Sequence, residues 1–536
     1  MNPLEAAALR RARRSSTTGG GYQAAFSGAI HNRLTADWIL AGIQSADQEV
    51  RQNLKTLKAR SRELARNNPH AGRFLDLKAD NILGDEGIQL QAQVLGPDGE
   101  FQQAVNQEIE DGWKRWCEVG ICTADGREAW QDVERMGVIE EARDGDTFIR
   151  LLPSWRENEF GFALQPIDPD QIDVDLNETS GTDARGNRRR EIRMGVEINE
   201  WGRPVAYHIH SNHPSEPGAR DTGRVRVPAE QMIHWYRPYR VGQTRGVPDF
   251  APVLLTQKML QGYEEAELVA SRIAAAKGGF FERSPEAIQL LNLGGEDSDP
   301  FTMEVEPGLF ESLPAGWKFS QWDPTHPTTA FPDFHKAMLR TIATGLGISY
   351  NVLAQDLEGV SFSSIRTQML SERETWRSIQ ANLWRHVHTR VYRAWLLWAI
   401  TTGALELPAR DPSLFQRVRW QPRGWDWVDP MKDSQASMLE LRMGVNSRTR
   451  IAAAKGRNFE DLVEEQRRER ELMEAAGLEI STDAGMSGGS SRDGEEGSSD
   501  ASPSRLSRLF GDGTHARTGR SSAPTGTGVR NGTHAS

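Results

Sequence analysis

One stretch, residues 331–403, constrains the fold most, because apolar side chains recur along it at helical intervals. A first helix is predicted to begin at Phe331, where apolar residues follow one another at spacings of three and four. Gly345 and Gly347 are expected to end it, because glycine adopts the left-handed backbone of a helix C-terminus without steric cost. A second helix is predicted from about 365 to about 399, a rod of roughly 50 Å at 1.5 Å per residue. The fold must accommodate two helices separated by a break and a short polar loop.

The second helix has both an apolar face and candidate caps. Ser361, Ser363 and Ser364 precede it, and a serine at an N-cap accepts a hydrogen bond from a backbone amide of the first turn. Its apolar positions, spaced by three, four or seven, are Ile365, Met369, Trp376, Ile379, Leu383, Val387, Val391, Trp395 and Trp398. This spacing predicts one uninterrupted helix.

Charge and cysteine content exclude several classes of protein. The chain has 536 residues, enough for two to four domains, and 64 basic against 75 acidic residues give a net charge of −11. Such a chain is not expected to wrap nucleic acid tightly, although nucleic acid that slides past without adhering remains compatible with it. The two cysteines exclude a disulfide framework. No apolar run approaches the ~18 residues of a membrane span and no secretory signal is recognisable, so we expect a soluble intracellular protein.

Composition and periodicity divide the first 145 residues. Residues 1–30 are rich in Arg, Ser, Gly and Ala without periodicity and are predicted to be a mobile arm. A helix is predicted over 34–67, stopped by Asn68 and Pro69, with mixed structure at 74–83. Residues 102–145 are predicted to be mostly helical, with the apolar anchors Trp113, Trp116, Trp130, Val133 and Met136.

From 147 to about 240 the apolar spacing changes to two, which is typical of strands. The residues at 199–202, Asn-Glu-Trp-Gly, favour a hairpin between the strands that flank them. The predicted strands are 147–152, 194–198, 205–209, 225–227 and 232–235. An antiparallel β unit inserted among helices places the chain in the α+β class.

Another long helix is predicted after the strands, over residues 249–282. Small residues, Ala270 and then Ala274 to Ala276, make its second half slim, as close helix packing requires. Residues 284–330 are rich in Pro and Gly and are expected to form a small hairpin-like module between two long helices.

The C-terminal part begins with a tryptophan-rich segment within 411–480. Two amphipathic helices are predicted there, at 431–443 and 458–476. Residues 481–536 consist mainly of Gly, Ser, Thr and Asp and are expected to be disordered.

The sequence lacks motifs for nucleotide chemistry. A Walker A loop needs Gly-Lys before Ser or Thr, and the dipeptide Gly-Lys does not occur. Gly345 and Gly347 form a lone Gly-x-Gly that ends a helix instead of following a strand, which disfavours a dinucleotide site. Residues 485–489 match the nucleophile elbow formally, but no strand precedes them.

Histidines and cysteines allow a metal site as an alternative to a structural role. His208 and His210 share one face of a predicted strand and His213 follows, a spacing that a metal could use, although an exposed hairpin and turn explain it equally well. Cys117 and Cys122 lack a second pair of ligands, so buried thiols are favoured over zinc.

An acidic run at Asp168, Asp170, Asp173 and Asp175 suggests Ca²⁺ or a two-metal nuclease. The run lacks the glycine and terminal glutamate of an EF-hand loop, and a turn before a strand is the alternative. We therefore predict no catalytic residue, no cofactor and no metal.

Five segments together resemble the lambda-type phage portal protein family over about residues 30–480. Individually none is a chemical signature, and their order carries the resemblance. They are RELARNNP (62–69), GVEINEWGRPVAYH (195–208), RVGQTRGVP (240–248), LRTIATGLGISY (339–350) and SSIR (363–366). The chain departs from the family at Ser361 and Phe362, where Asn and Tyr would be expected.

The resemblance implies a ring-forming subunit, with a dodecamer at one capsid vertex through which DNA passes. It assigns the segments as a mobile arm (1–30), wing (31–247), first stem helix (248–283), clip (284–330), second stem helix (331–348), tunnel loop (349–364), long wing helix (365–410), crown (411–480) and disordered tail (481–536). The DNA-facing loop residues would be Gln355, Asp356, Leu357, Glu358, Gly359, Val360, Ser361, Phe362 and Ser363. The candidate channel cations are Lys277, Arg283, Lys336 and Arg340, each of which could equally pair with a neighbouring subunit's carboxylates.

The partners implied by the resemblance are further copies of the chain, double-stranded DNA without sequence preference, the terminase large subunit, a head–tail adaptor, and the major capsid or scaffold protein, with no membrane. It also implies location at the portal vertex of the virion after assembly in the host cytoplasm. Two other classes remain open from the sequence: a metal-dependent DNA-processing enzyme using the acidic run, and a capsid shell or scaffold protein.

Overall fold

The computed structural model of the protein describes residues 44–182, 188–217, 223–275, 279–283, 317–321, 330–425 and 430–477. The chain divides into two units, Met1–Glu465 and Gln466–Ser536. The predictions for the arm (1–30), for most of the module at 284–330 and for the tail (481–536) lie outside the described residues. The elements below belong to the first unit, except for the C-terminal part of the last helix, α14.

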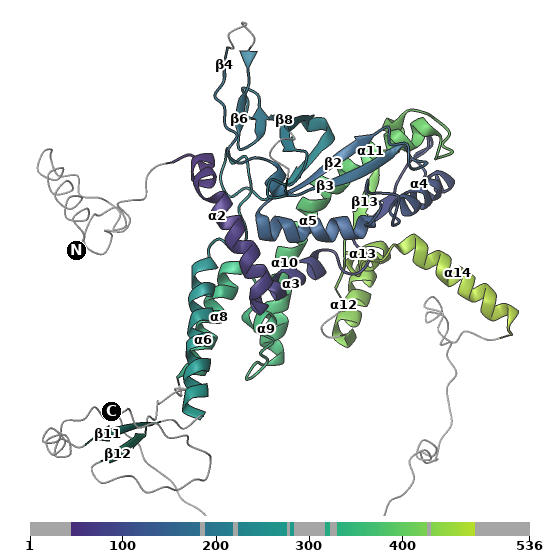
Figure 1. Cartoon of the computed structure of the whole chain (residues 1–536). Coiled ribbons are helices and arrows are strands. Elements are labelled where there is room, and N and C mark those ends of the chain that lie inside the picture. The colour runs from purple at the N-terminus through teal and green to yellow at the C-terminus, as the bar shows by residue number, and fades with distance from the viewer. Residues whose placement is uncertain are drawn as a thin grey trace, which may run out of the picture. The chain divides into compact units, whose positions relative to one another are not determined.

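Helices and small antiparallel sheets alternate along the chain (Figure 1), which confirms the α+β class. The helices are α2 (Ala46–Asn67), α3 (Pro69–Ile82), α4 (Gln103–Trp116), α5 (Trp130–Asp144), α6 (Leu254–Ala275), α8 (Phe331–Leu346), α9 (Tyr350–Ala354), α10 (Phe362–Leu383), the π-helix η6 (Trp384–His388), α11 (Thr389–Thr402), α12 (Pro430–Arg442), α13 (Arg448–Ala454) and α14 (Phe459–Ala475), with 3₁₀ turns η3 (Pro169–Gln171), η5 (Ala229–Gln231) and η7 (Pro412–Phe415). The strands are β1 (Gln89–Ala92), β2 (Thr147–Pro153), β3 (Phe162–Ile167), β4 (Gly181–Thr182), β5 (Arg188–Arg189), β6 (Glu191–Arg193), β7 (Val196–Ile198), β8 (Pro204–His210), β9 (Arg224–Pro228), β10 (Met232–Trp235), β11 (Gly279–Arg283), β12 (Trp317–Gln321) and β13 (Val418–Gln421). Of the helices described, none has the length and apolarity that crossing a bilayer would require.

Asn68 both ends α2 and begins α3. Its backbone amide donates to the Leu64 carbonyl at 2.9 Å, and its side chain accepts from the Ala71 amide at 3.1 Å. Pro69 then takes the first helical position, where its missing N–H costs nothing. The predicted stop of the first helix is confirmed, but the mixed structure predicted at 74–83 is wrong, because the chain resumes a helix at once.

The central sheet, in the order β10-β2-β3, is buried on both faces. Ile149 and Leu151 of β2 pack into the helical core, whereas Phe148 faces the other way and packs with Tyr207 and Val227. The latter two belong to another antiparallel sheet, β6-β7-β8-β9, so the predicted β unit contains more than one sheet, and this cluster of buried residues joins the two. The period of two predicted β2, β8, β9 and β10, but it missed β3 and β6, and it placed Met194 in a strand although the chain turns there with φ 48°.

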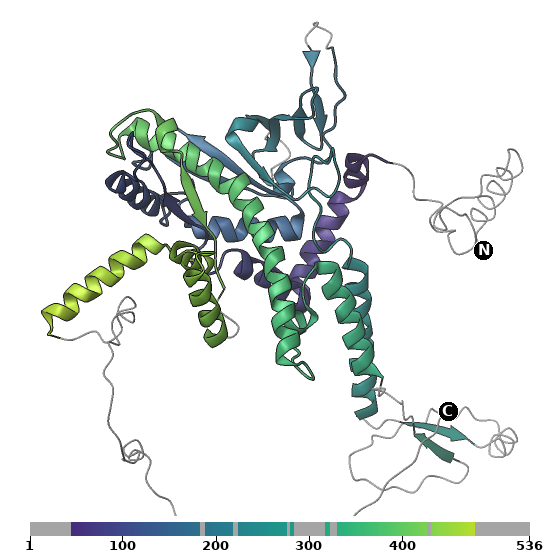
Figure 2. The ribbon, with the colours of Figure 1, turned by 180° about the vertical axis from the view of Figure 1, so that it is seen from behind.

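The rod predicted at 365–399 is present as α10, η6 and α11, helical from Phe362 to Thr402. Figure 2 shows it from behind as one long green helix. It is not a regular α-helix throughout, because residues 384–388 form a π-turn. The Thr389 hydroxyl donates to the Trp384 carbonyl at 2.9 Å and accepts from the Trp420 indole at 3.1 Å, which stabilises this turn. Gly403, at φ 79°, ends the rod.

Tryptophans from α4, α5, α11 and β13 form the centre of the main core. The ring of Trp113 lies 5.0–6.2 Å, centroid to centroid, from the rings of Trp116, Trp130, Tyr392, Trp395 and Trp420. Four of the five predicted anchors are buried, but Met136 is 38% exposed and was wrongly assigned to the core.

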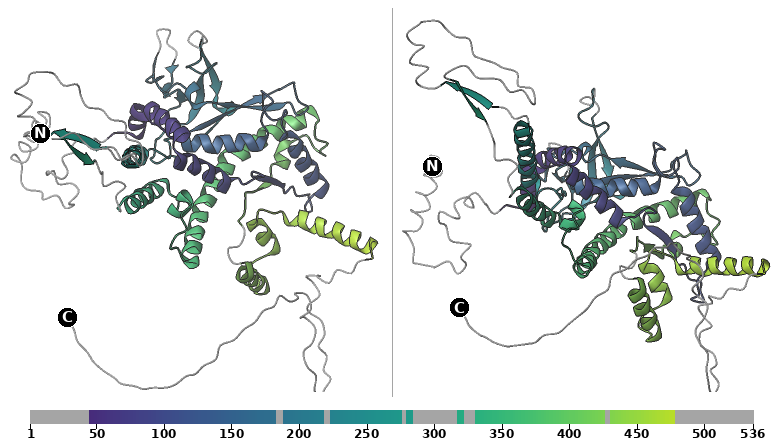
Figure 3. Two further views of the ribbon diagram at one scale, coloured as in Figure 1. Left: turned by 60° about the horizontal axis from the view of Figure 1, so that its bottom comes forward. Right: turned by 90° about the horizontal axis from the view of Figure 1, so that it is seen from below.

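The helices α6 and α8 lie side by side (Figures 1 and 3). The strands β11 and β12 come between them in the sequence. The long helix predicted over 249–282 is shorter at both ends, because 279–283 is strand β11, paired antiparallel with β12. Gly347, at φ 70°, ends α8 as predicted. Gly345 does not break the helix but lies within it, where a β-carbon would come 2.4 Å from Val253 Cγ1.

The two amphipathic helices predicted near the C-terminus are confirmed as α12 and α14. Between them the sequence reasoning missed α13, which Ser447 caps by accepting from the Arg450 amide at 3.2 Å. Trp420 lies in β13, which pairs with β1 more than 300 residues earlier in the chain.

Candidate functional site

The loop that joins α9 to α10 is the candidate site predicted from the resemblance. Gln355 follows α9 with φ 52°, a left-handed conformation that turns the chain out of the helix. Phe362 and Ser363, predicted as loop residues, belong to the first turn of α10. Of the loop predicted over 349–364, residues 350–354 form helix α9 and α10 already begins at Phe362, so the loop comprises only residues 355–361.

Ser361 caps α10. Its side-chain oxygen accepts a hydrogen bond from the Ser364 amide at 3.3 Å, which satisfies one of the free amides of the first turn. The hydroxyls of Ser363 and Ser364 lie 3.1 and 2.8 Å from the Ser361 hydroxyl. Of the three candidate caps, the first in the chain is the one used.

Lys336 of α8 contacts this loop. Its Nζ lies 2.8 Å from Glu358 Oε2 and 3.2 Å from Asp356 Oδ2. These hydrogen bonds, the one to Glu358 foremost, raise the pKa of Lys336 and keep the ammonium charged. The sequence left a channel-facing cation and a partner of a neighbouring subunit's carboxylates as alternatives, whereas in the structure Lys336 pairs with carboxylates of its own chain.

Asp356 connects the base of the loop to the preceding helices. It accepts from the Tyr350 hydroxyl at 2.7 Å and from the Glu358 amide at 3.0 Å. The Tyr350 hydrogen bond foremost, with those from the amide and Lys336, lowers the pKa of Asp356 to about 2. The guanidinium of Arg340 lies over the Tyr350 ring, 5.2 Å from its centroid. Of the two predicted cations of α8, Lys336 thus contacts the loop itself, and Arg340 contacts Tyr350 of α9, which donates to the loop residue Asp356.

Beyond this base the loop is exposed. Leu357 is 67% exposed and Gly359 turns the chain at φ 68°. Ion pairs and hydrogen bonds hold the base of the loop at Asp356 and Glu358. A loop held in this way suits an electrostatic or steric role. Of the other two predicted cations, Lys277 lies outside the described residues, and Arg283 lies in β11 opposite Trp317 instead of on a helix.

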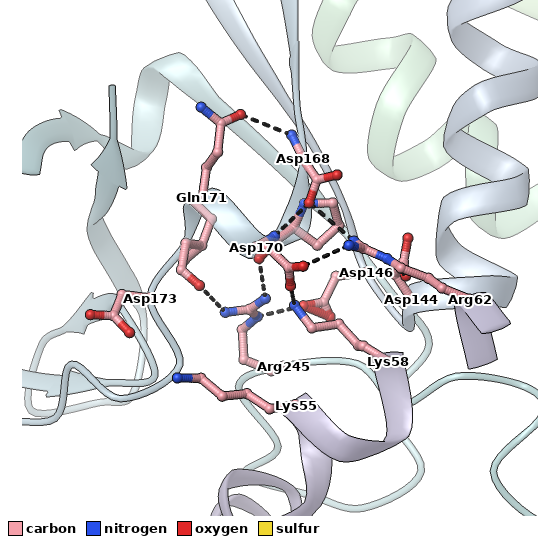
Figure 4. A network of polar contacts seen from close by, with 12 residues as sticks. Lys55, Lys58, Arg62, Asp144, Asp146, Asp168, Asp170, Gln171, Asp173 and Arg245 are labelled. Carbon is pink, nitrogen blue, oxygen red and sulfur yellow. Dashed lines mark hydrogen bonds and ion pairs between the residues drawn. The ribbon is translucent and has the colours of Figure 1, made fainter. Parts of the chain in front are cut away.

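The acidic run is occupied by protein cations. Arg62 lies 3.0 Å from Asp168 Oδ1 and 2.6 Å from Asp170 Oδ2, and Lys58 also pairs with Asp170 (Figure 4). The remaining two carboxylates, Asp173 and Asp175, pair with Arg224 and Lys55. Every carboxylate of the run therefore has a lysine or arginine partner, which is unlike a two-metal nuclease, where metal ions neutralise the carboxylates.

Arg245 forms the centre of the same region (Figure 4). Its side chain is fully buried against Asp146, and its Nη1 donates to the Met194 carbonyl at 3.0 Å. Burial alone would raise the pKa of Asp146, but the charges of Arg245 and His234 lower it to about 2. Two of the five segments that carry the resemblance, at 62–69 and 240–248, thus meet around one ion-pair network.

The histidines 208, 210 and 213 do not form one site. His208 lies 3.5 Å from Glu197, His210 lies 3.8 Å from Asp173, and His213 lies 3.9 Å from Asp168. Cys117 and Cys122 are buried free thiols, as predicted. Burial raises the pKa of Cys122 to about 12, so this thiol stays protonated and unreactive. The stretch 485–489 lies outside the described residues.

The sequence reasoning missed the buried cations. Lys58 is 2% exposed, and Lys78, 1% exposed, has its Nζ 2.6 Å from both Glu141 and Asp249. A signal was present for Lys58, because it lies at helical spacing between the buried Leu54 and Ser61 on the inner face of α2. A lysine on the apolar face of a predicted helix indicates either that the helix prediction is wrong or that the lysine has a buried carboxylate partner.

Comparison with known proteins gives the following matches. The family model described as "Phage portal protein, lambda family" matches residues 31–380. A probable portal protein of Halomonas phage phiHAP-1 is 35% identical over 445 residues, covering 82% of this chain and 84% of the relative. Portal protein B of Escherichia phage lambda is 24% identical over 479 residues, covering 81% of this chain and 87% of the relative. Among solved structures, chains from the necks of an empty and a native gene transfer agent (GTA) particle match with TM-scores of 0.41 and 0.37, at 14% and 13% identity, covering 76% and 74% of this chain and 94% and 93% of those chains.

Proposed function

Because this chain belongs to the lambda family of phage portal proteins, we propose that its copies assemble into a closed ring through which double-stranded DNA enters and leaves a capsid. Membership makes it a structural portal protein and not an enzyme. The DNA-processing enzyme and the capsid shell or scaffold protein, both open from the sequence, have no support. The ring, a dodecamer in our proposal, would occupy the portal vertex of the virion after assembly in the host cytoplasm.

The proposal of a ring rests on the apolar side chains that α6 leaves exposed. By helical spacing Leu255, Met259 and Val269 lie on one side of α6, where they are 73%, 66% and 47% exposed, whereas Leu268, 63% exposed, lies on another side and Leu260 is buried. The exposure of these four exposed side chains is equivalent to about two and a half whole side chains, so covering them would contribute roughly 4–7 kcal/mol per copy. A helix with exposed apolar side chains favours burial against another surface. The neighbouring copy in a ring supplies one.

The charge of the chain supports passage of DNA without adhesion. Twelve copies at −11 each would carry a total charge of about −130, which would repel a phosphate backbone. The positive charge of Lys336 does not reduce this repulsion, because Glu358 and Asp356 of the same chain neutralise that charge. We place the exposed loop 355–361 at the bore, held at its base by α8.

The segment assignments follow the same proposal. The helices α6 and α8 would be the stem, the module at 284–330 the clip, residues 31–247 and 365–410 the wing, and 411–480 the crown. The clip would bind the terminase large subunit during packaging and a head–tail adaptor afterwards. The wing would contact the major capsid or scaffold protein.

Imaging of the purified full chain tests the ring. Negative-stain images and native mass spectrometry at micromolar concentration should show closed rings with an aperture of at least about 20 Å, the width of B-form DNA. Met259→Glu, which places a charge on the exposed apolar side of α6, should shift the chain toward monomers. Leu414→Glu is the matched control, because Leu414 is 57% exposed in η7, away from α6, and should leave rings intact. Monomers alone from the unmodified chain would refute the proposal.

A further inference from the structure

Three metal-binding side chains from three helices converge beside α6 and α8. His70 lies on α3, Glu264 on α6 and His335 on α8. One ligand atom of each lies within 4.8 Å of the other two, and all three side chains are partly buried. Residues so far apart in sequence meet here only because the chain folds, so the site would exist only in the native state.

The ring of His335 is held in place on one side. Phe331, one turn earlier on α8, stacks on it at 5.7 Å and 26°, and Tyr263 stacks on Phe331 at 5.7 Å and 29°. On the other side His335 Nε2 lies 2.6 Å from Glu264 Oε1. An imidazole nitrogen and a carboxylate oxygen therefore already face each other across α6 and α8.

His70 completes the group from α3. Its ring centroid lies 6.5 Å from that of His335. The His70 ring also forms a hydrogen bond with the backbone of Leu353. Metal-bound histidines typically use their second ring nitrogen in this way, which fixes the tautomer and orients the ring.

We propose that His70, Glu264 and His335 bind one Zn²⁺ ion, with water as the fourth ligand. Two imidazoles and a carboxylate form a ligand set that zinc accepts in tetrahedral geometry. Bonds of 2.0–2.1 Å would place neighbouring ligand atoms about 3.3 Å apart, which side-chain rotation can reach from the present spacing. The partial exposure of His335 and Glu264, 25% and 35%, leaves a route for the ion and space for the water.

A second group of similar composition shows why this one is favoured. Asp168, Asp170 and His213 also lie within 4.8 Å of one another. Lys58 and Arg62 already pair with both carboxylates there, and a divalent cation would have to displace them. Glu264 instead pairs with His335, a residue that is itself a metal ligand. The bound ion would join α3 to α6 and α8.

Zinc content and affinity of the full chain test the site. The chain is stripped with a chelator, titrated with Zn²⁺ against a chromophoric competitor, and analysed for bound metal. We expect one Zn²⁺ per chain, and tetrahedral ligand-field bands when Co²⁺ replaces it. His335→Ala and His70→Ala should weaken binding by more than the roughly 10–100-fold that loss of an outer contact costs.

His213→Ala is the matched control and should keep the wild-type affinity. Glu264→Gln removes the carboxylate charge with little change of shape, and it too should bind Zn²⁺ far more weakly. This variant keeps the proposal testable if a histidine variant does not fold. Zn²⁺ should raise the thermal unfolding midpoint of the wild type and of His213→Ala only. Absence of stoichiometric zinc in the wild type, or unchanged affinity in Glu264→Gln, would overturn the proposal. Neither readout depends on ring formation.

Discussion

Replacing Arg245 by Met should be among the most destabilising single changes in the body of the protein. Arg245 and Asp146 are both fully buried, and Arg245 also donates to the carbonyls of Met194, Pro169 and Ile172 at 3.0, 3.3 and 3.4 Å. Methionine fills much of the space but leaves the Asp146 charge and these carbonyls unpaired. Removal of one partner from a buried ion pair costs about 3–5 kcal/mol. We expect a loss of that size.

The pH dependence supplies an independent test of the cause. The pKa of Asp146 is lowered from 3.8 to about 2, so the wild type gains stability from this group above pH 4 and loses it as the pH falls toward 2. A shift of this size corresponds to about 2–3 kcal/mol for a group that is fully buried. Without Arg245, burial would raise the pKa of Asp146 above its usual value, so the carboxyl would protonate on mild acidification. The stability gap between wild type and Arg245→Met should therefore narrow between pH 7 and pH 4.

The assay is urea unfolding followed by tryptophan fluorescence at one fixed chain concentration, because assembly would change the midpoint. The double variant Arg245→Met with Asp146→Asn should lose less stability than the sum of the two single losses, since no charge is then left unpaired. A loss below about 1 kcal/mol for Arg245→Met, or strict additivity in the double variant, would refute the role assigned to this pair.

Three further changes have defined outcomes. Trp113→Ala should cost about 3–5 kcal/mol in urea unfolding, because Trp113 joins the aromatic cluster of the core, whereas Trp201→Ala, at a position 86% exposed, should stay within about 0.5 kcal/mol. Gly246→Ala should prevent accumulation of folded protein, since its β-carbon would lie 1.8 Å from a backbone carbonyl oxygen; Gly181→Ala, with open space around it, should express normally, and equal soluble yields would contradict this. Asp356→Asn should speed amide hydrogen exchange at 357–360 without changing exchange in α10, because the neutral side chain holds Lys336 more weakly; unchanged exchange in the loop would show that the base is held otherwise.

Periodicity alone predicted the long elements well. The rod from α10 to α11 and the strands β2, β8, β9 and β10 lie within a few residues of their predicted bounds. The π-turn could not be predicted, because Leu383, Val387 and Val391 keep a spacing of four and are all buried whether or not one turn is wider. Hydrophobic spacing reports which face is buried and carries little information on the hydrogen bonds beneath it.

The polar contacts were less predictable from sequence. Arg62 and Arg245 belong to residue types that are rarely buried, and their carboxylate partners lie about 100 residues away in the chain. A loop was predicted over 349–364, and the structure has one at 355–361, but the sequence did not predict the pairing of Lys336 with it. Which carboxylate a lysine meets depends on the packing of α8 against α9, and no local pattern encodes it.

The pairing of β1 with β13 has a consequence for how the protein is made. Gln91 in β1 also donates through its side-chain amide to Asn458, 367 residues later. Translation at 5–20 residues per second leaves the first strand waiting for roughly 20 to 70 seconds before its partners have been synthesised. Until then the edge of β1 is unpaired, so the nascent polypeptide cannot reach its mature form. In the proposed ring, assembly would then wait until each subunit is nearly complete, which would keep truncated products out of the finished particle.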